Sequence, residues 1–204
     1  MSGVRVRRAG PADVDRAAAV LADAFADYAW TRWTVDADDH AARIYGLQRL
    51  VIERIALPHG EVWVANDDDA AIVSAAIWML PTSSVPLRIL EAAAAAQAEL
   101  EGSRHDASLR AEAACAPIRP AEPHFYLGAV GTHSDRQREG LATAVLAPVL
   151  DRAEHENTPA FLETSDRANV EFYERLGFRV TGEIDVPDGG PHVWGMLRVR
   201  STSS

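Results

Sequence analysis

The chain contains no lysine and only one cysteine, and both shortages narrow its chemistry. Its 20 basic residues are all arginines, and 30 acidic residues give a net charge of −10. A chain this acidic lacks the basic face expected of a nucleic-acid-binding protein, and it suits a cationic ligand better than an anionic one. Cys115 alone can form neither an intramolecular disulfide nor a cysteine-rich metal site. We therefore expect a reducing, cytoplasmic compartment and no nucleic-acid partner.

Long apolar runs are also absent. No run approaches the roughly 18 apolar residues that a membrane span needs. Residues 1–8 lack the apolar segment of a secretory signal peptide. We therefore predict no membrane partner. The histidines show neither the His-x-x-x-His nor the His-Glu-x-x-His spacing of zinc sites, so we also predict no metal.

Strand and helix patterns alternate along the whole chain without an internal repeat. The Asn66–Asp69 cluster predicts a turn between two strands of a hairpin. Tyr28–Val35 is interpreted as an aromatic loop, and Pro148 is expected to kink its helix. The unbroken pattern favours a single α/β domain with a mixed sheet over residues 1–204. Strands are predicted at 4–8, 61–65, 71–79, 124–132, 160–164, 178–185 and 193–200, and helices at about 11–25, 38–57, 86–101, 107–116, 141–155 and 166–176.

A polar loop, Gln137-Arg138-Glu139-Gly140-Leu141-Ala142, lies between a predicted strand and helix. Glycine lets a backbone approach a ligand closely, and amides at a helix N-terminus point toward an anion, so the unit can cradle a phosphate. The loop lacks the Gly-Lys-Ser/Thr of a P-loop and the glycines of a dinucleotide fingerprint. On spacing alone, a plain connection is an equal alternative.

A second motif follows, in which Asn169, Tyr173, Gly177 and Phe178 recur at fixed spacing. Together with Gln137, Gly140 and Ala142, it resembles the pattern of the GNAT acyltransferase superfamily over roughly residues 124–180. Over most of the chain the sequence also resembles the puromycin N-acetyltransferases, most densely at 159–165 and 172–178. The likeness implies one α+β domain with a mixed, mostly antiparallel central sheet flanked by helices. Residues 81–118 contain an Ala-rich stretch that is helical by propensity, and we predict a helical insertion there.

The resemblance implies acetyl-CoA as co-substrate. The backbone of Val130, Gly131 and Thr132 would meet the pantetheine arm by extending the sheet. Glu139 departs from the pattern, because an acid beside phosphates repels them: either its side chain points away or CoA binds more weakly. The resemblance assigns the rest of the cofactor site to Gln137, Arg138, Glu139, Gly140, Leu141, Ala142, Thr143, Asn169 and Phe172.

Tyr173 would protonate the departing CoA thiolate, since a phenol has a reference pKa of about 10 and a thiol about 8.5. Its alternative role is a core aromatic beside Phe172. The general base is open: by alternation the strand at 124–132 offers His124 and Tyr126, without Glu or Asp. His124 could titrate near neutral pH, but it also stands at a strand start, where a structural role is common.

The aromatic residues Tyr28, Trp30 and Trp33 are the candidates for the acceptor site, because aromatic faces hold flat or cationic amines. Core packing is the alternative for them. No nucleophile elbow is present, which favours direct transfer in a ternary complex over an acyl-enzyme.

The resemblance therefore implies transfer of an acetyl group to the primary amine of a small molecule, with puromycin or a similar aminonucleoside among the candidates. The alternatives are acetylation of a peptide N-terminus or another amine, including polyamines, and a non-catalytic acyl-CoA-binding sensor. Monomer and homodimer both stay open.

Overall fold

A computed structural model describes residues 4–199. The first three and last five residues of the predicted domain lie outside the described residues, and the last five include Arg200 at the end of the last predicted strand. The strands are β1 (Arg5–Arg8), β2 (Gly60–Asn66), β3 (Ile72–Met79), β4 (Phe125–Thr132), β5 (Ala160–Thr164), β6 (Arg179–Asp185) and β7 (His192–Arg198). The helices are α1 (Val14–Phe25), α2 (Ala29–Thr34), α3 (His40–Val51), α4 (Leu57–His59), α5 (Leu87–Glu101), α6 (His105–Cys115), α7 (Leu141–His155) and α8 (Arg167–Arg175).

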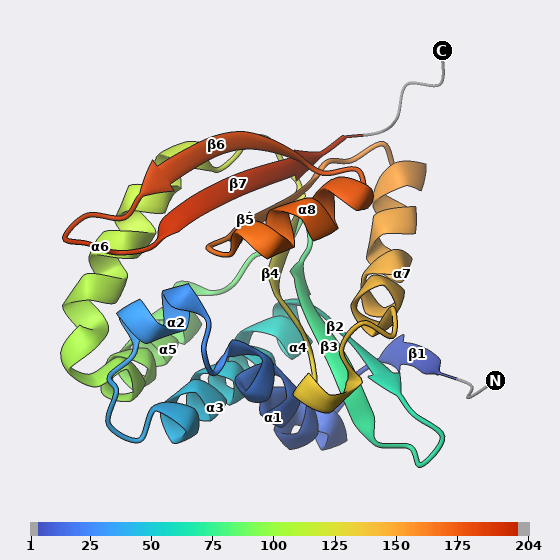
Figure 1. Ribbon diagram of the computed structural model, residues 1–204, viewed down its shortest axis with the longest axis horizontal. Helices are drawn as coiled ribbons and strands as arrows, with labels where there is room; N and C mark the ends of the chain where they lie inside the picture. The colour runs from blue at the N-terminus through green and yellow to red at the C-terminus, as the bar shows by residue number, and fades with distance from the viewer. Residues whose placement is uncertain (1–3, 200–204) are drawn as a thin grey trace.

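The strands form one sheet in the order β1-β2-β3-β4-β5-β7-β6 (Figure 1). Each neighbouring pair is antiparallel except β4 and β5, which run parallel. The predicted hairpin is confirmed: β2 pairs with β3 across the turn that begins at Asp67. The expected single domain with a mixed, mostly antiparallel sheet is therefore confirmed.

The sheet opens between its two central strands. β4 pairs with β5 only through Phe125–Leu127, although β4 continues along β3 as far as Thr132. The β3–β4 register shifts between Ile77 and Trp78, where Gly128 is the extra residue of β4. A bulge of this kind bends the bulged strand. From Gly128 onward, the edge of β4 that faces away from β3 has no strand partner among the described residues.

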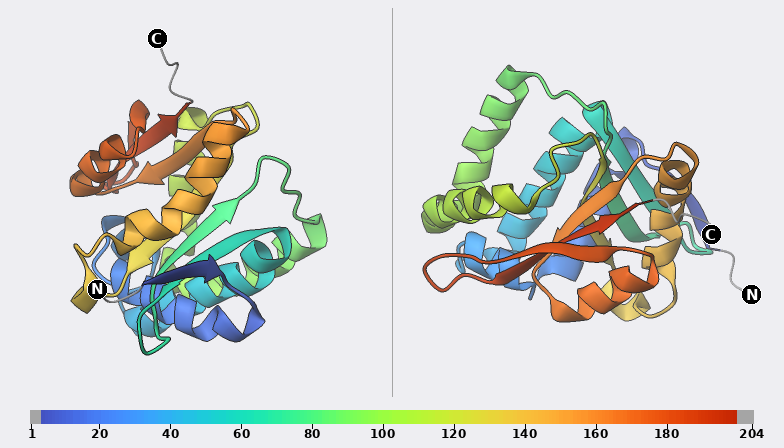
Figure 2. Two further views of the ribbon diagram at one scale, coloured as in Figure 1. Left: turned by 90° about the vertical axis from the view of Figure 1, so that its right-hand side faces the viewer. Right: turned by 90° about the horizontal axis from the view of Figure 1, so that it is seen from above.

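Helices cover both faces of the sheet (Figure 2). On one face, α1 packs its buried stripe, which includes Ala17, Ala18 and Leu21, against Val64 and Ile77 of the sheet. Spacing of three and four residues gives a helix one such apolar stripe. On the other face, α7 and α8 share a second core with Trp78, Phe125 and Phe178. Helix α7 continues through Pro148 from Leu141 to His155, as its predicted bounds required.

The structure corrects the interpretation of Tyr28–Val35 as a loop, because Ala29–Thr34 form helix α2. Aromatic and β-branched residues are weak helix formers, so propensity did not reveal this helix. Tertiary contacts override the propensity here: Arg104 donates to the Trp33 carbonyl at 2.6 Å and lies 4.3 Å above the Trp33 ring. Thr34 closes the last turn by donating to the Trp30 carbonyl at 2.9 Å.

The segment 81–118 is mainly two helices, α5 and α6, which project to the left of the sheet in Figure 1. Helix α6 packs on α2 and on the β6–β7 end of the sheet through Ala111, Cys115, Val186 and Val193. Its C-terminal end thereby reaches the opening between β4 and β5.

Candidate active site

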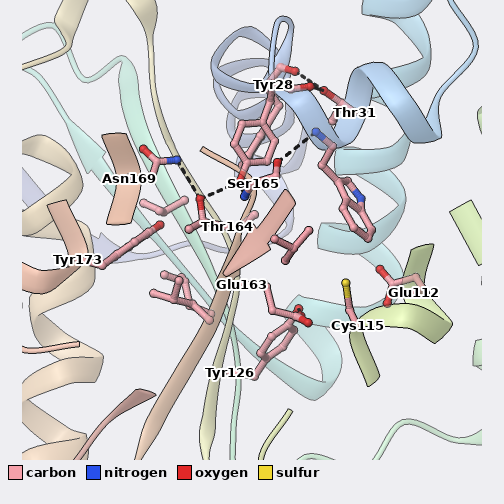
Figure 3. Close-up of a pocket in the computed structure, with 18 of the residues that line it drawn as sticks. Tyr28, Thr31, Glu112, Cys115, Tyr126, Glu163, Thr164, Ser165, Asn169 and Tyr173 are labelled. Carbon is pink, nitrogen blue, oxygen red and sulfur yellow. Dashed lines mark hydrogen bonds between the residues drawn. The ribbon is translucent and has the colours of Figure 1, made fainter. Parts of the chain in front are cut away.

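A cavity of about 220 Å³ lies where the sheet opens (Figure 3). Its walls come from α2, α6, α8, both central strands and the residues just after them. The residues that line it and carry polar or aromatic side chains are Phe25, Tyr28, Trp30, Thr31, Gln48, Glu112, Cys115, Arg119, Tyr126, Glu163, Thr164, Ser165, Asn169 and Tyr173. Segments far apart in sequence therefore meet at one hollow.

Tyr173 enters this cavity from α8, with its hydroxyl directed toward the cavity interior (Figure 3). The side chain is 6% exposed, and its hydroxyl forms no hydrogen bond within the described part of the chain. Burial, with a smaller contribution from Tyr28, raises the pKa of Tyr173 above the ordinary phenol value. Tyr173 therefore stays protonated at neutral pH, with a hydroxyl free to donate into the cavity.

Local sequence explains how α8 presents Tyr173. Asp166 caps the helix by accepting from the Ala168 amide at 2.9 Å, as short polar side chains at a helix N-cap commonly do. At the other end, Gly177 adopts φ +88°, and the Phe178 amide donates back to the Tyr173 carbonyl at 3.1 Å. This left-handed closure is the usual glycine C-cap of an α-helix.

A hydrogen-bonded cluster links α2 to the end of β5. The Ser165 amide donates to the Tyr28 hydroxyl at 2.6 Å, and the Tyr28 and Thr164 hydroxyls are 2.9 Å apart. The Asn169 side-chain amide donates to the Thr164 hydroxyl at 3.3 Å. Tyr28 and Asn169, predicted for acceptor and cofactor respectively, thus meet at one threonine.

A carboxylate that the sequence analysis did not assign stands at the opposite end of the cavity. Glu163 of β5 accepts from the Tyr126 hydroxyl at 2.9 Å and from Arg119 Nε at 3.0 Å on each oxygen. Arg119 also donates to Glu112 of α6 at 2.8 Å. Alternation along β4 alone does not reveal this carboxylate, because it is the parallel β4–β5 pairing that places Glu163 beside Tyr126. The available signal was a lone carboxylate within the buried strand 160–164.

Two of the residues predicted for catalysis or acceptor binding, His124 and Trp33, lie away from the cavity lining. His124 bonds to the Glu122 carbonyl at 2.7 Å and packs edge-on against Phe161. Trp33 borders a separate hollow between α2 and the β6–β7 turn, together with Arg32 and Gly190. Both roles stay predictions, and the geometry favours Tyr126 over His124 and Trp30 over Trp33.

The predicted phosphate loop follows β4. Gly140 has φ +79° and directly precedes α7, so the first amides of that helix face outward from the loop. Glu139 is paired with Arg136, whose Nε and Nη2 lie 3.0 and 2.9 Å from its oxygens. Arg136 also contacts Asp67 of the β2–β3 turn at 3.3 Å. The hydrogen bonds from Arg136 lower the pKa of Glu139, so the carboxylate stays ionised and its charge is balanced by the guanidinium. The sequence allowed either a Glu139 side chain that points away or weaker CoA binding. The structure shows a third arrangement, in which Arg136 compensates the charge of Glu139.

The remaining predicted cofactor residues lie along the same side. Val130 lines the cavity, while Gly131 and Thr132 continue the free edge of β4 toward the loop. Leu141 is the buried first residue of α7, and Ala142 and Thr143 follow it in the first turn. Phe172 packs edge-to-face on Tyr173 with ring centres 5.1 Å apart.

Cys115 lines the cavity but is a poor nucleophile. Burial, followed by the charges of Glu163 and Glu112, raises the pKa of the Cys115 thiol to about 12. A thiol attacks as the thiolate, so this cysteine is essentially unreactive at neutral pH. Among residues 4–199, no cluster of three or more His, Cys, Asp or Glu side chains could hold a metal ion. None of the helices in those residues is long and apolar enough to cross a membrane.

The chain matches the Acetyltransferase (GNAT) family over residues 22–178. It belongs to this family. GNAT enzymes use acetyl-CoA as co-substrate, and the protein is an acetyl-CoA-dependent N-acetyltransferase. Its fold is therefore that of a GNAT acetyltransferase.

Solved GNAT structures share the whole fold. The chain is similar to a histone acetyltransferase HPA2 and related acetyltransferase from Corynebacterium glutamicum, with 28% identity and a TM-score of 0.75 over 100% of this chain and 99% of that one. It shares the fold of a polyamine N-acetyltransferase from Drosophila melanogaster, with 14% identity and a TM-score of 0.63 over 97% and 100%. It also shares the fold of the ribosomal-protein-S18-alanine N-acetyltransferase from Escherichia coli, with 15% identity and a TM-score of 0.58 over 99% and 97%.

Proposed function

We propose that this GNAT enzyme acetylates the primary amine of a small molecule directly from acetyl-CoA, with a puromycin-type aminonucleoside as the first acceptor to test. One observation carries the proposal: a single cavity joins the free edge of β4 and Tyr173 to an aromatic and acidic end formed by Trp30, Tyr126 and Glu163. The thioester and the amine can therefore meet without crossing solvent.

The β4 side of the cavity fits acetyl-CoA. An unpaired strand edge at Val130–Thr132 offers backbone groups to the amides of the pantetheine arm. The loop Gln137–Gly140 and the first turn of α7, through Thr143, offer amides to the pyrophosphate. Asn169 and Phe172 border the same path from α8.

The other end of the cavity fits an amine with an apolar or aromatic part. Glu112, Glu163 and Arg119 carry a formal net charge of −1, and the indole and phenol rings of Trp30 and Tyr28 flank the space. At about 30 Å³ per water, a cavity of about 220 Å³ equals roughly seven waters. The cavity therefore holds the reacting end of an acceptor, and a larger acceptor such as an aminonucleoside would extend beyond it.

The proposed reaction forms a bond between the amine nitrogen and the acetyl carbon and breaks the bond between that carbon and sulfur. Tyr173 donates its proton to the departing sulfur, which leaves as CoA thiol. The amine nitrogen loses one proton to a base at the acidic end of the cavity. Both side chains then exchange protons with solvent and return to their starting states.

Transfer in a ternary complex is favoured over an acetyl-enzyme. Cys115 is the nucleophile type nearest the acceptor end, and its raised pKa of about 12 opposes thiolate attack. An amine held by the aromatic end meets the thioester in the same cavity. Peptide N-termini would satisfy the same chemistry and are the alternative acceptors.

The test is CoA-thiol release from acetyl-CoA with a panel of puromycin, short peptides with free N-termini, and polyamines. Turnover with puromycin but not with peptides or polyamines supports the proposed acceptor. Release with peptides alone overturns the small-molecule assignment. Acetyl-CoA binding without release on any amine supports the acyl-CoA-sensor alternative and overturns the proposed function.

A further inference from the structure

Four polar side chains form a continuous chain of contacts at the acceptor end of the cavity. Tyr126 donates to Glu163 at 2.9 Å, Arg119 grips both oxygens of Glu163, and Arg119 reaches Glu112 at 2.8 Å. Glu163 is 11% exposed, whereas Arg119 and Glu112 are 33% and 46% exposed. The chain thus runs from the molecule's interior toward solvent, with Tyr126 and Glu163 at its inner end.

The direction of the Tyr126 hydrogen bond decides what its oxygen can do. An ionised carboxylate only accepts, so the proton between the two groups belongs to the Tyr126 hydroxyl. The lone pairs of that phenol oxygen therefore remain available to another donor. Because Tyr126 lines the cavity, the N–H of an amine bound there is a suitable donor.

We propose that Tyr126 and Glu163 together accept the proton that the acceptor amine loses, and that Arg119 is a positioning residue that holds Glu163 for this transfer. As nitrogen bonds to the acetyl carbon, its proton passes to the Tyr126 oxygen while the Tyr126 proton passes to Glu163. The tyrosine ends the step neutral, and Glu163 ends it protonated until it exchanges with solvent. This inference rests on the proposed amine acetylation.

The contacts explain why the transfer is relayed. Both oxygens of Glu163 already accept from Arg119, and one of them also accepts from Tyr126. Arg119 and Tyr126 together orient Glu163 toward the phenol. An amine that donates to the Tyr126 oxygen is therefore separated from Glu163 by the Tyr126 hydroxyl. Burial, with a further contribution from Glu163, raises the pKa of Tyr126 well above its ordinary value. The phenol therefore gives up its proton only as it receives another one.

Charged and polar groups face Glu163 from the elements packed against it. Arg119 faces it from the segment before β4, Tyr126 faces it from β4, and Cys115 and Glu112 face it from α6. His124 approaches the Tyr126 ring edge-on, with ring centres 6.4 Å apart. The Arg119 cation contacts both oxygens of Glu163, while Glu112 offsets part of that cation's charge.

The test compares Glu163→Gln and Tyr126→Phe with the wild type, using an amine that the wild type acetylates. A glutamine oxygen can still accept from Tyr126 but cannot take up a proton. We expect kcat to fall by about a hundredfold or more in each variant, with unchanged acetyl-CoA affinity. Because the free amine itself titrates in kcat/KM, the relay is read from the pH profile of kcat at saturating amine, and this profile should change in Glu163→Gln.

The relay also predicts that the two changes are not additive. The double variant Tyr126→Phe/Glu163→Gln should be about as slow as either single variant, because each removes the same transfer. Arg119→Lys, which keeps the charge but cannot grip both oxygens, should lower kcat without raising the KM for acetyl-CoA. Fully additive losses overturn the relay, as does a Glu163→Gln enzyme that keeps the wild-type pH profile.

A matched control separates chemistry from structure. Glu61 is another buried carboxylate held by an arginine, accepting from Arg152 at 2.9 Å and from the Trp63 indole at 2.9 Å, but it does not line the cavity. Glu61→Gln should lower stability while leaving the pH profile unchanged. If Glu163→Gln fails to fold, Tyr126→Phe, which loses one hydroxyl, still decides the case. A wild type without turnover on any amine refutes the proposed function, whereas an active wild type with an equally active Tyr126→Phe refutes only the relay.

Discussion

Gly131 of β4 lies close against α1, and Gly131→Ala tests whether this contact sets the free edge of β4. A β-carbon at position 131 would lie 2.6 Å from Ala24 Cβ and 3.1 Å from Leu21 Cδ2. Two carbon atoms that are not linked by bonds do not approach to 2.6 Å in folded proteins. The Ala24 methyl cannot rotate away, because it is fixed to the backbone of α1. The strand or the helix must therefore shift.

Such overpacking costs about 1–3 kcal/mol of stability. A chain of this size loses roughly 2–4 °C in Tm per kcal/mol, so we expect a decrease of about 2–12 °C. The same shift displaces the Val130–Thr132 edge that we propose for the pantetheine arm. The KM for acetyl-CoA should therefore rise in Gly131→Ala. Thermal unfolding and initial-rate kinetics measure the two effects on one preparation.

Gly128→Ala is the matched control in the same strand. The nearest atoms to a β-carbon there, on Ile77 and Tyr126, lie 3.9 Å away, which is ordinary van der Waals contact. We expect a stability change within about 0.5 kcal/mol for this variant. A Gly131→Ala protein with the wild-type Tm and the wild-type KM for acetyl-CoA would refute the packing argument, and so would equal destabilisation by both substitutions.

Three further predictions follow from the site and the fold. Tyr173→Phe should lower kcat by about a hundredfold or more while acetyl-CoA affinity, measured by calorimetry, stays close to that of the wild type, and unchanged turnover would remove Tyr173 from the chemistry. Arg136→Ala should raise the KM for acetyl-CoA by exposing the charge of Glu139, and Arg136→Ala/Glu139→Gln should recover most of that loss; no recovery would mean that Arg136 acts on the phosphates itself. The ion pair with Arg7 lowers the pKa of Asp13 to about 2 from its usual 3.8, so its stabilisation is complete above about pH 4 and is lost as the pH falls toward 2. Asp13→Asn should therefore destabilise the protein at pH 6 and progressively less below pH 4 in denaturant titrations.

Much of the fold could be predicted because its signals are local. The Asn66–Asp69 cluster marks the β2–β3 turn, and helices α7 and α8 show their buried stripes at helical spacing. Gly177 marks the end of α8 because only glycine adopts its φ of +88° without strain. The same spacing placed Tyr173 on the helix that borders the cavity.

Helix α2 could not be predicted for a complementary reason. Its stability comes from contacts with residues more than 65 positions away, such as Arg104 on the Trp33 carbonyl and Ser165 on the Trp30 amide. No window of sequence around Trp30 contains these partners. Both Trp30 and Trp33 lie in α2, and only the orientation of that helix against its partners decides that Trp30 lines the cavity and Trp33 does not.

Glu163 shows how strand pairing decides which residues can share a reaction. Alternation along β4 offers His124 and Tyr126, of which Tyr126 lines the cavity, but alternation along one strand cannot show what the neighbouring strand contributes. The parallel register pairs Tyr126 with Phe161 and Leu127 with Leu162, so Glu163 follows just beyond the last pair, where the strands separate. A carboxylate at that position can reach Tyr126 and Arg119 at once.

The same geometry resolves how an acidic protein can bind a polyanionic co-substrate. Within the loop 134–140, the charges of Arg136 and Arg138 are balanced by those of Asp135 and Glu139, and Asp67 adds another negative charge nearby. Net positive charge therefore cannot be the basis of phosphate binding. What the loop offers is the left-handed turn at Gly140, the outward amides at the start of α7, and Arg138, which forms no ion pair within residues 4–199. Directed amides act at short range, so the rest of the surface can remain acidic and still suit a cationic acceptor.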